Sequence, residues 1–388
     1  MRLRTLDYAE YQVTPREWSL NGLMLGQVNL VVGKNASGKS RTLNVINGLG
    51  RLLSGAQKPA AMSSGSYKIL FDHEGRLLRY NIDIQDRKVL HEEFIDGETV
   101  RLTRGEGGSG RIYHVKEDQD FDFQTPESDA AAVARLDKIQ HGFLAPLAEW
   151  AEGVRHYEFG SYMGRTHLAV IVTPPPDPDP RDANAIIGLF RRGVKLFPNV
   201  FAETVKRDMS AIGYEIDDIG TMAPTDIALQ IPLGSNIEPM ILYVKERDLA
   251  GVTQQPYISQ GMFRALAVII HMAYATLASR PSCIIVDDIG EGIDFDRSCK
   301  LIKLIRDRAK QADIQLILST NDKFVMNEVP IEEWSILQRT GGHVWVRNHA
   351  NAKDAFDNFQ YVGMSNFTFF EMDFVNGRPQ MEAATAHE

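Results

Sequence analysis

The sequence predicts an α/β fold with a mixed central sheet, an antiparallel meander and a helical lobe. A strand-like run at 27–33 leads through a glycine-containing loop into an amphipathic helix at 39–53. Two apolar runs, 283–286 and 314–318, have the composition of parallel strands buried on both faces. Between these parts, short alternating runs at 66–116 predict antiparallel hairpins.

The 388 residues divide into three predicted segments. Residues 1–120 hold the N-terminal part of the core with the glycine-containing loop and the meander. Residues 121–280 are predicted as a helical lobe that ends in a long apolar helix, and 281–388 return to the core. Inside the lobe, 128–152 and 183–213 read as helical and 238–248 as a strand.

The composition limits the classes of function. The net charge of −9 argues against a polybasic nucleic-acid binder, although a local basic face stays open. The only two cysteines are too few for a disulfide framework. The longest apolar stretch, from Ala265, is interrupted by His271 and is too short to cross a bilayer. We therefore expect a cytoplasmic chain with no membrane segment.

The stretch "VVGKNASGKS" at 31–40 matches the phosphate-loop pattern G-x-x-x-x-G-K-[ST]. Its glycines let the backbone curl so that successive N–H groups face phosphate oxygens, and the helix N-terminus adds partial positive charge. Lys39 is expected to reach the β- and γ-phosphates, and the Ser40 hydroxyl to coordinate Mg²⁺. The predicted nucleotide-binding residues are Gly33, Lys34, Asn35, Ala36, Ser37, Gly38, Lys39, Ser40 and Arg41.

A phosphate loop needs a second acidic element to hold Mg²⁺. The apolar run at 283–286 ends in two adjacent carboxylates, Asp287 and Asp288. Asp287 is the predicted Mg²⁺ ligand. Asp288 stands where many phosphate-loop ATPases place the carboxylate that polarises the attacking water, and Glu291 is an alternative base.

The stretch "YISQGMFRALAVIIHMAYATL", from Tyr257, is similar to the signature motif of ABC-type ATPases, commonly L-S-G-G-Q. Ser259, Gly261 and Arg264 fit that motif, whereas three other positions depart from it: Ile258, Gln260 and Met262. The strand at 314–318 ends at Asn321, where those ATPases usually carry a switch histidine. Asp294 lies where they have their D-loop aspartate. Up to about residue 340 the chain therefore resembles the soluble ABC-type ATPases of the SMC, RecF and OLD group.

The resemblance implies ATP and Mg²⁺ as cofactors and a head-to-tail homodimer. Each ATP would lie between the phosphate loop of one copy and the signature of the other, at Ser259, Gln260 and Gly261. Lys39, Asp288 and Asn321 would carry the catalysis.

Asp288 is one methylene shorter than the usual glutamate, and Asn321 can donate a hydrogen bond to phosphate but cannot become charged by taking up a proton, as histidine can. We therefore expect slow hydrolysis and a long-lived ATP-bound dimer. A backbone that brings Asp288 closer to the nucleotide would instead restore ordinary turnover.

The sequence shows no pattern for two features of larger ABC-type ATPases, the coiled-coil arms of SMC proteins and the toprim acid cluster of OLD nucleases. About 220 residues separate the phosphate loop from the signature, with neither heptads nor a Cys-x-x-Cys hook, which argues against long coiled-coil arms. No toprim-like acid cluster follows. We therefore expect a separate effector, such as a nuclease, or a DNA-bound partner, as in bacterial anti-phage defence. A non-hydrolysing ATP-gated scaffold and a RecF-like DNA repair ATPase remain open.

Two further features carry expectations. The glutamine that usually completes the Mg²⁺ shell in this family has no clear position, and Gln140 is the candidate. The aromatic-rich stretch from Phe356 to Phe374 is expected to pack back on the core, with a docking surface for a partner as the alternative. The last residues, 378–388, are expected to be frayed.

Overall fold

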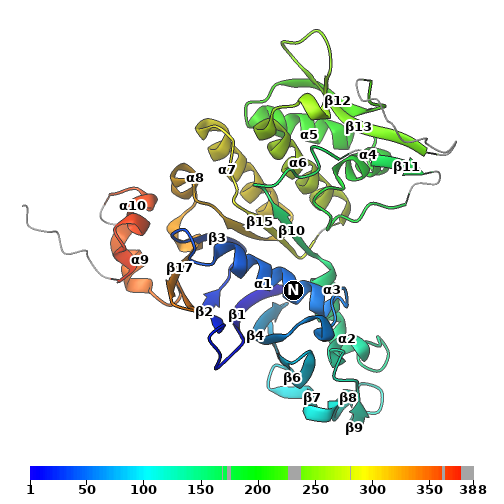
Figure 1. Ribbon diagram of the computed structural model, residues 1–388, viewed down its shortest axis with the longest axis vertical. Coiled ribbons are helices and arrows are strands. Elements are labelled where there is room, and N and C mark those ends of the chain that lie inside the picture. Colours follow the sequence, from blue (N-terminus) through cyan, green and yellow to red (C-terminus); the bar gives the residue numbers. More distant parts are fainter. Residues whose placement is uncertain (168, 173–175, 226–236, 280, 361–362, 377–388) are drawn as a thin grey trace, which may run out of the picture.

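The fold is taken from a computed structural model. It describes residues 1–388 except 168, 173–175, 226–236, 280, 361–362 and 377–388. Figure 1 shows one sheet through the middle of the molecule, a lobe of helices and strands at one end and the meander at the other.

Among the described residues, fourteen strands form one mixed sheet, in the order β10-β15-β16-β3-β17-β18-β2-β1-β4-β5-β6-β7-β8-β9. The first five strands in that order are parallel, and β4 to β9 form the predicted antiparallel meander. The fourteen strands are β1 (Arg2–Glu10), β2 (Trp18–Met24), β3 (Val28–Val32), β4 (Ser64–His73), β5 (Arg76–Gln85), β6 (Lys88–Asp96), β7 (Thr99–Arg104), β8 (Ser109–His114), β9 (Gln119–Gln124), β10 (Val154–Glu158), β15 (Cys283–Asp287), β16 (Gln315–Ser319), β17 (Trp334–Thr340) and β18 (His343–Asn348).

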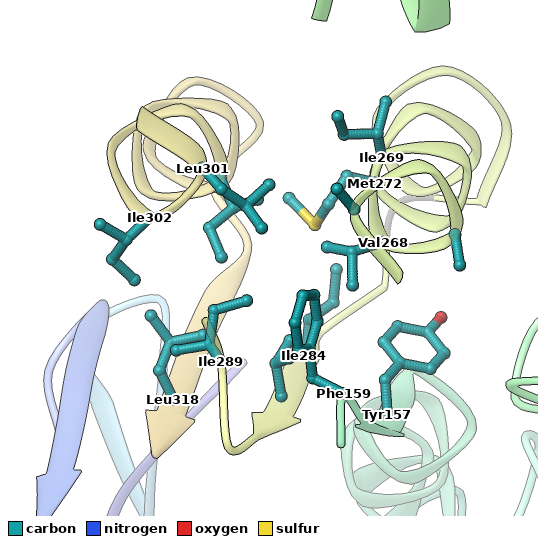
Figure 2. Close-up of a cluster of buried hydrophobic side chains, with 14 of the residues drawn as sticks. Tyr157, Phe159, Val268, Ile269, Met272, Ile284, Ile289, Leu301, Ile302 and Leu318 are labelled. Atoms are coloured by element: carbon teal, nitrogen blue, oxygen red, sulfur yellow. The ribbon is translucent and has the colours of Figure 1, made fainter. Parts of the chain in front are cut away.

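Helices cover the parallel part of the sheet on both faces, which explains why β3, β15 and β16 are apolar throughout. Helix α1 (Lys39–Leu53) packs on one face. Helices α6 (Gln260–Tyr274) and α7 (Phe295–Gln311) pack on the other. Figure 2 shows Val268 and Met272 of α6 and Leu301 of α7 meeting side chains of β10, β15 and β16.

The lobe differs from the predicted helical segment 121–280. Its helices α4 (Ile186–Leu196) and α5 (Val200–Ala211) pack with α6, but a small sheet lies beside them. That sheet contains β11 (Ala169–Val172), β12 (Ile216–Met222), β13 (Ile237–Glu246) and β14 (Thr253–Gln254). Strand β10 belongs to the core sheet, so the lobe begins after Glu158 and not at residue 121.

The prediction of a helical run over 128–152 was wrong for most of its length. The segment forms only two short α-helices, α2 (Ala131–Ala134) and α3 (Ala145–Glu152). The start of α2 is fixed by Glu92 of β6, whose carboxylate accepts the backbone N–H groups of Ala131 and Ala132 at 2.7 and 2.8 Å. This long-range contact leaves no sign in the local helical periodicity.

Glu92 also anchors the meander through a fully buried ion pair with Arg104 of β7, at 3.0 Å. The Tyr80 hydroxyl donates to the same carboxylate at 2.9 Å, and Arg104 donates to the carbonyls of Thr125 and Pro126. The pair therefore joins three strands of the meander to the segment that precedes α2. Residues 105–108 form the turn between β7 and β8, within the stretch predicted to form hairpins.

The aromatic C-terminal segment packs on the core. It contains α9 (Lys353–Gln360) and α10 (Asn366–Glu371), and α10 packs against α8 (Lys323–Asn327). Phe356, Phe359 and Phe369 are buried in the same core as α6 and α7. Tyr361 and the expected frayed tail lie outside the described residues. The remaining short helical turns are η1 (Pro59–Ala61), η2 (Glu106–Gly108), η3 (Gly142–Leu144), η4 (Gln255–Tyr257), η5 (Ala275–Ser279), η6 (Ile331–Glu333) and η7 (Phe374–Asn376).

The apolar stretch from Ala265 was predicted to be too short to cross a bilayer, and this was wrong for the helix that contains it: within the described ranges, one helical stretch, Gln260–Ala278, is long and apolar enough by length and composition. Buried residues make up 78% of its apolar window. Its composition is therefore accounted for by its place in the core, between the sheet and α4, α5 and α7.

Candidate nucleotide-binding site

The phosphate loop lies between β3 and α1, as predicted, and its backbone explains its glycines. A Cβ atom added at Gly33 would come within 2.3 Å of Ser37 Oγ, so only glycine allows the loop to close this tightly. Gly38 precedes α1 with φ of 103°, and Ala36 has φ of 63°. These left-handed positions curl the chain into a cradle at the N-terminus of α1.

Lys39 lies buried inside this loop, where its Nζ donates to the Gly33 carbonyl at 2.9 Å. Burial lowers the pKa of Lys39, and the nearby carboxylates Asp288 and Asp287 oppose that shift. The predicted phosphate-binding lysine and the two predicted acids therefore lie within electrostatic reach of one another, although 248 positions separate Lys39 from Asp287 in the chain.

The first turn of α1 exposes Ser40 and Arg41. Arg41 forms an ion pair with Glu10, and its guanidinium lies 4.2 Å from the centroid of the Trp18 ring. These contacts hold Arg41 beside the phosphate loop. Ser40 remains open to solvent, as a ligand for a nucleotide-bound cation requires.

Asp287 ends β15 on the sheet face that carries α1. Ile285 and Cys283, two and four positions earlier, pack in the same core as α1. Because side chains of a strand alternate between the two faces of the sheet, Asp287 lies on that face too. Ser319, at the end of β16, donates its hydroxyl hydrogen to the Asp287 carboxylate and accepts the Asp288 N–H at 2.9 Å. One serine thus orients both acids, although only the acids were predicted as site residues.

Asp288 and Asn321 are in direct contact, since Asn321 Nδ2 donates to Asp288 Oδ1 at 3.1 Å. Asp288 has φ of 55°, a left-handed backbone that Asp adopts more readily than most residues. Burial raises the pKa of Asp288, and the negative charges of Asp287 and Glu291 add to that rise, while Lys39 opposes it. The predicted base and the predicted switch residue therefore form one unit at the open edge of the sheet.

A third carboxylate, Glu158, lies next to Asp287 but was not among the predicted site residues. It ends β10, and the parallel register pairs it with Asp287, so both side chains point to the face of α1. The Phe159 N–H donates to the Asp287 carbonyl at 2.9 Å and fixes this register. The sequence alone does not show that β10 ends at Glu158 or which strand is its neighbour.

Gln140 was the wrong choice for the glutamine of the Mg²⁺ shell. The Gln140 carbonyl accepts the N–H of Val115, which lies in the turn between β8 and β9. Gln140 itself is exposed. Strand β8 is nine places from β3 in the sheet, which corresponds to about 40 Å at the usual strand spacing.

The signature-like segment forms the N-terminus of α6, with Ser259 as N-cap and its Oγ accepting the Met262 N–H at 3.3 Å. Ser259 and Gln260 are exposed, and Gly261 is partly buried. A Cβ atom at Gly261 would come within 2.5 Å of the Gly292 carbonyl oxygen, so glycine is required there. No hydrogen bond joins this segment to the phosphate loop of the same chain; both segments lie in the described part.

Arg264 plays a structural part in this region. It is buried, and it donates to the carbonyls of Gly160, Ser161 and Glu291, with the last contact at 2.9 Å. It thereby ties the signature helix to the loops that follow β10 and β15. Asp294, the predicted D-loop residue, caps α7 and pairs with Arg297 at 2.7 Å.

The described residues contain no cluster of three or more His, Cys, Asp or Glu side chains that would hold a metal ion by themselves. Mg²⁺ bound with a nucleotide needs no such cluster, because phosphates and waters supply most of its ligands. An exposed Ser40, a buried Asp287 and a partly buried Asp288 fit that mode of binding.

Comparison with solved structures agrees with this architecture. The crystal structure of an SmcHead bound to the C-winged helix domain of ScpA has a TM-score of 0.52 and 11% sequence identity. The match covers 89% of this chain and 98% of that one. The chain has the fold of an SMC head domain. The mixed sheet and this similarity fit a P-loop ATPase fold, so the predicted α/β class is confirmed.

Two further SMC heads match with lower scores. The Thermotoga maritima SMC head domain has a TM-score of 0.43 and 12% identity, with 90% of this chain and 99% of that chain covered. A Pyrococcus furiosus Smc head with an extended coiled coil, bound to the C-terminal domain of ScpA, has a TM-score of 0.49 and 9% identity, with 92% and 99% covered. No protein family matches this SMC-head-like chain, and no curated protein does.

Proposed function

We propose that this chain is an ABC-type ATPase that binds ATP with Mg²⁺, hydrolyses it slowly and dimerises around it to switch a separate effector. The observation that carries the proposal is the meeting of three segments distant in sequence. Lys39 in the phosphate loop, Asp287 on β15 and the Asp288–Asn321 pair lie at one edge of the sheet.

Each residue has a distinct task in the proposed reaction. The N–H groups of the phosphate loop and Lys39 bind the phosphates, while Ser40 and Asp287 hold Mg²⁺, which neutralises charge developing on the phosphates. Glu158 pairs with Asp287 across β10 and β15, and we propose that it does the work of the family's glutamine in the Mg²⁺ shell. Asp288 polarises the attacking water, and Asn321 orients the Asp288 carboxylate through its amide.

Slow turnover follows from the geometry of Asp288. Its side chain is about 1.5 Å shorter than that of glutamate, and a misplacement of about 1 Å can cost on the order of a hundredfold in rate. From a median enzyme turnover of about 10 s⁻¹, this predicts about 0.1 s⁻¹.

The dimer is supported by the exposure of Ser259 and Gln260 at the N-terminus of α6. N–H groups at a helix N-terminus attract phosphate, and among the described residues no hydrogen bond joins this segment to the phosphate loop of the same chain. A second copy placed head to tail would bring its γ-phosphate there. Hydrolysis would remove that phosphate and release the dimer.

A separate protein partner fits the similar SmcHead, which was solved with a domain of ScpA. We propose that the effector, such as a nuclease in anti-phage defence, is likewise a separate protein. DNA bound by the dimer is a further candidate trigger. The absence of DNA binding at low salt would exclude that trigger.

The test combines nucleotide binding with steady-state phosphate release. The wild type should bind a fluorescent ATP analogue, and Lys39→Ala should not. Asp288→Asn should retain binding and lose phosphate release. Lys116→Ala, at the exposed turn between β8 and β9, is the matched control and should behave as the wild type. Rapid hydrolysis that survives Asp288→Asn would overturn the assignment of the base.

An ATP-gated scaffold without hydrolysis is the second candidate. The hydrogen bond that Asn321 donates to the Asp288 carboxylate favours it, because a donated hydrogen bond lowers the basicity of a carboxylate. This function predicts phosphate release at the level of Asp288→Asn, together with stable ATP-bound dimers.

A further inference from the structure

The loop after β15 and the signature segment are joined by direct contacts, which constrains what must meet the phosphate loop in a dimer. Arg264 of α6 donates to the Glu291 carbonyl at 2.9 Å, and Gly261 lies against Gly292. Any partner that brings its signature to a phosphate loop therefore brings residues 288–297 with it.

This loop presents unpaired negative charge. Glu291 and Asp296 are exposed, and neither forms an ion pair with a described residue. Asp294, between them, is neutralised by Arg297. The carboxylates of Glu291 and Asp296 are therefore available, beside the signature segment, to pair with a cation of another molecule.

The flank of the phosphate loop presents the opposite charge. A pocket of about 530 Å³ lies between the loop, the end of β17 and the C-terminal segment, and Lys34 and Arg339 line it. Both cations are exposed, and across the described residues neither pairs with a carboxylate. Arg339 is held in place by the carbonyls of Ala36 and Gly341, at 2.9 and 2.8 Å.

One acid, Asp373, also lines this pocket. Its carboxylate accepts the side-chain amides of Gln338 and Asn376 at 3.0–3.3 Å, so its hydrogen-bonding capacity is used within the chain. With Lys34 and Arg339 against one acid, the pocket keeps a net positive charge.

An exposed aromatic pair lies next to the acidic loop. Phe295 is 50% exposed and Phe324 is 39% exposed, with ring centroids 4.3 Å apart. Aromatic side chains are enriched in the cores of protein interfaces, with charges at the rim. Phe295 is an exposed aromatic residue with an exposed acid on either side in the sequence, Asp294 and Asp296.

We infer that the occupant of the Lys34–Arg339 pocket is the 288–297 loop of a second copy, with Glu291 and Asp296 paired to the two cations. This inference rests on the proposed nucleotide-dependent dimer. Two-fold symmetry gives two such contacts in each dimer, so one substitution removes both. The contact adds charge-based selectivity for the partner, and added salt should weaken it.

A charge exchange between Arg339 and Asp296 tests the pairing. Dimerisation would be measured by sedimentation velocity with Mg²⁺ and AMP-PNP, and nucleotide binding would be measured separately. Arg339→Glu and Asp296→Arg should each weaken the dimer by about tenfold or more, because each places like charges together. The double variant Arg339→Glu/Asp296→Arg should regain most of the wild-type affinity.

Lys116→Glu makes a similar charge change at the far end of the sheet and should leave dimerisation unchanged. Single variants that dimerise as the wild type would overturn the inference, as would a double variant weaker than either single. Asp296→Arg keeps the test valid if Arg339→Glu fails to fold. A wild type that binds AMP-PNP and stays monomeric would refute both the pairing and the dimer of the proposed function. If the wild type dimerises and the charge variants dimerise equally well, only the pairing is refuted.

Discussion

Lengthening the side chain of Asp288 should raise the rate of ATP hydrolysis. In Asp288→Glu the added methylene moves the carboxylate about 1.5 Å further toward the solvent edge of the site, where the attacking water must lie. Because a misplacement of about 1 Å can cost on the order of a hundredfold, the expected gain lies between about tenfold and a hundredfold. The variant should also lose the hydrogen bond from Asn321, now 3.1 Å.

The backbone sets a limit on this gain. Asp288 has φ of 55°, and a longer side chain is less favourable there, by up to about 1 kcal/mol. That cost lowers the free energy of unfolding but does not shorten the reach of the carboxylate. A modest fall in stability should therefore accompany the faster reaction.

Single-turnover phosphate release measures the effect without interference from product release. Asp287→Glu, the same methylene added one residue earlier, is the matched control and should slow the reaction, because it displaces the predicted Mg²⁺ ligand. A wild type that already turns over at tens per second would refute the reasoning, as would an Asp288→Glu variant no faster than the wild type.

Three further predictions concern residues around the site and in the core. Ser319→Ala removes the hydrogen bonds to Asp287 and Asp288 and should weaken Mg²⁺-dependent activity by about tenfold to a hundredfold, measured by Mg²⁺ titration; an unchanged midpoint would contradict it. Glu92→Ala leaves Arg104 buried without its partner and should cost about 3–5 kcal/mol in denaturant unfolding, and a cost below 1 kcal/mol would be inconsistent with a dry pair. Burial lowers the pKa of His271 to about 4, so as the pH falls this imidazole takes up its proton in the unfolded chain before it does so in the folded one. The free energy of unfolding should therefore drop by about 3 kcal/mol between pH 6.5 and 4. His271→Gln should lessen that drop.

The motifs predicted residues that the fold brings to one edge of the sheet, because they combine residue type with strict spacing. The loop at 33–40 carries its own strand, glycines and helix, so its conformation is decided locally. Asp287, Asp288 and Asn321 follow strands whose apolar composition shows that they are central, and the carboxyl ends of parallel strands share one edge.

The residues that were missed depend on which strands are neighbours. Glu158 reaches Asp287 only through the pairing of β10 with β15, and β10 lies 129 positions before β15 when their first residues are compared. Arg339 reaches Ala36 because β17 lies next to β3. The predicted start of the lobe at residue 121 differs from the structure for the same reason. Strand β10 belongs to the core sheet, and its own sequence does not identify that sheet.

Dimerisation around ATP is the central claim, and a mass measurement tests it most directly. The chain has a mass of 43.5 kDa, so mass photometry with Mg²⁺ and AMP-PNP should show a species of twice that mass. With ADP, and for Lys39→Ala with either nucleotide, only the single-chain mass should appear. A wild type that binds AMP-PNP and remains at 43.5 kDa, or dimerises equally without nucleotide, would contradict the account.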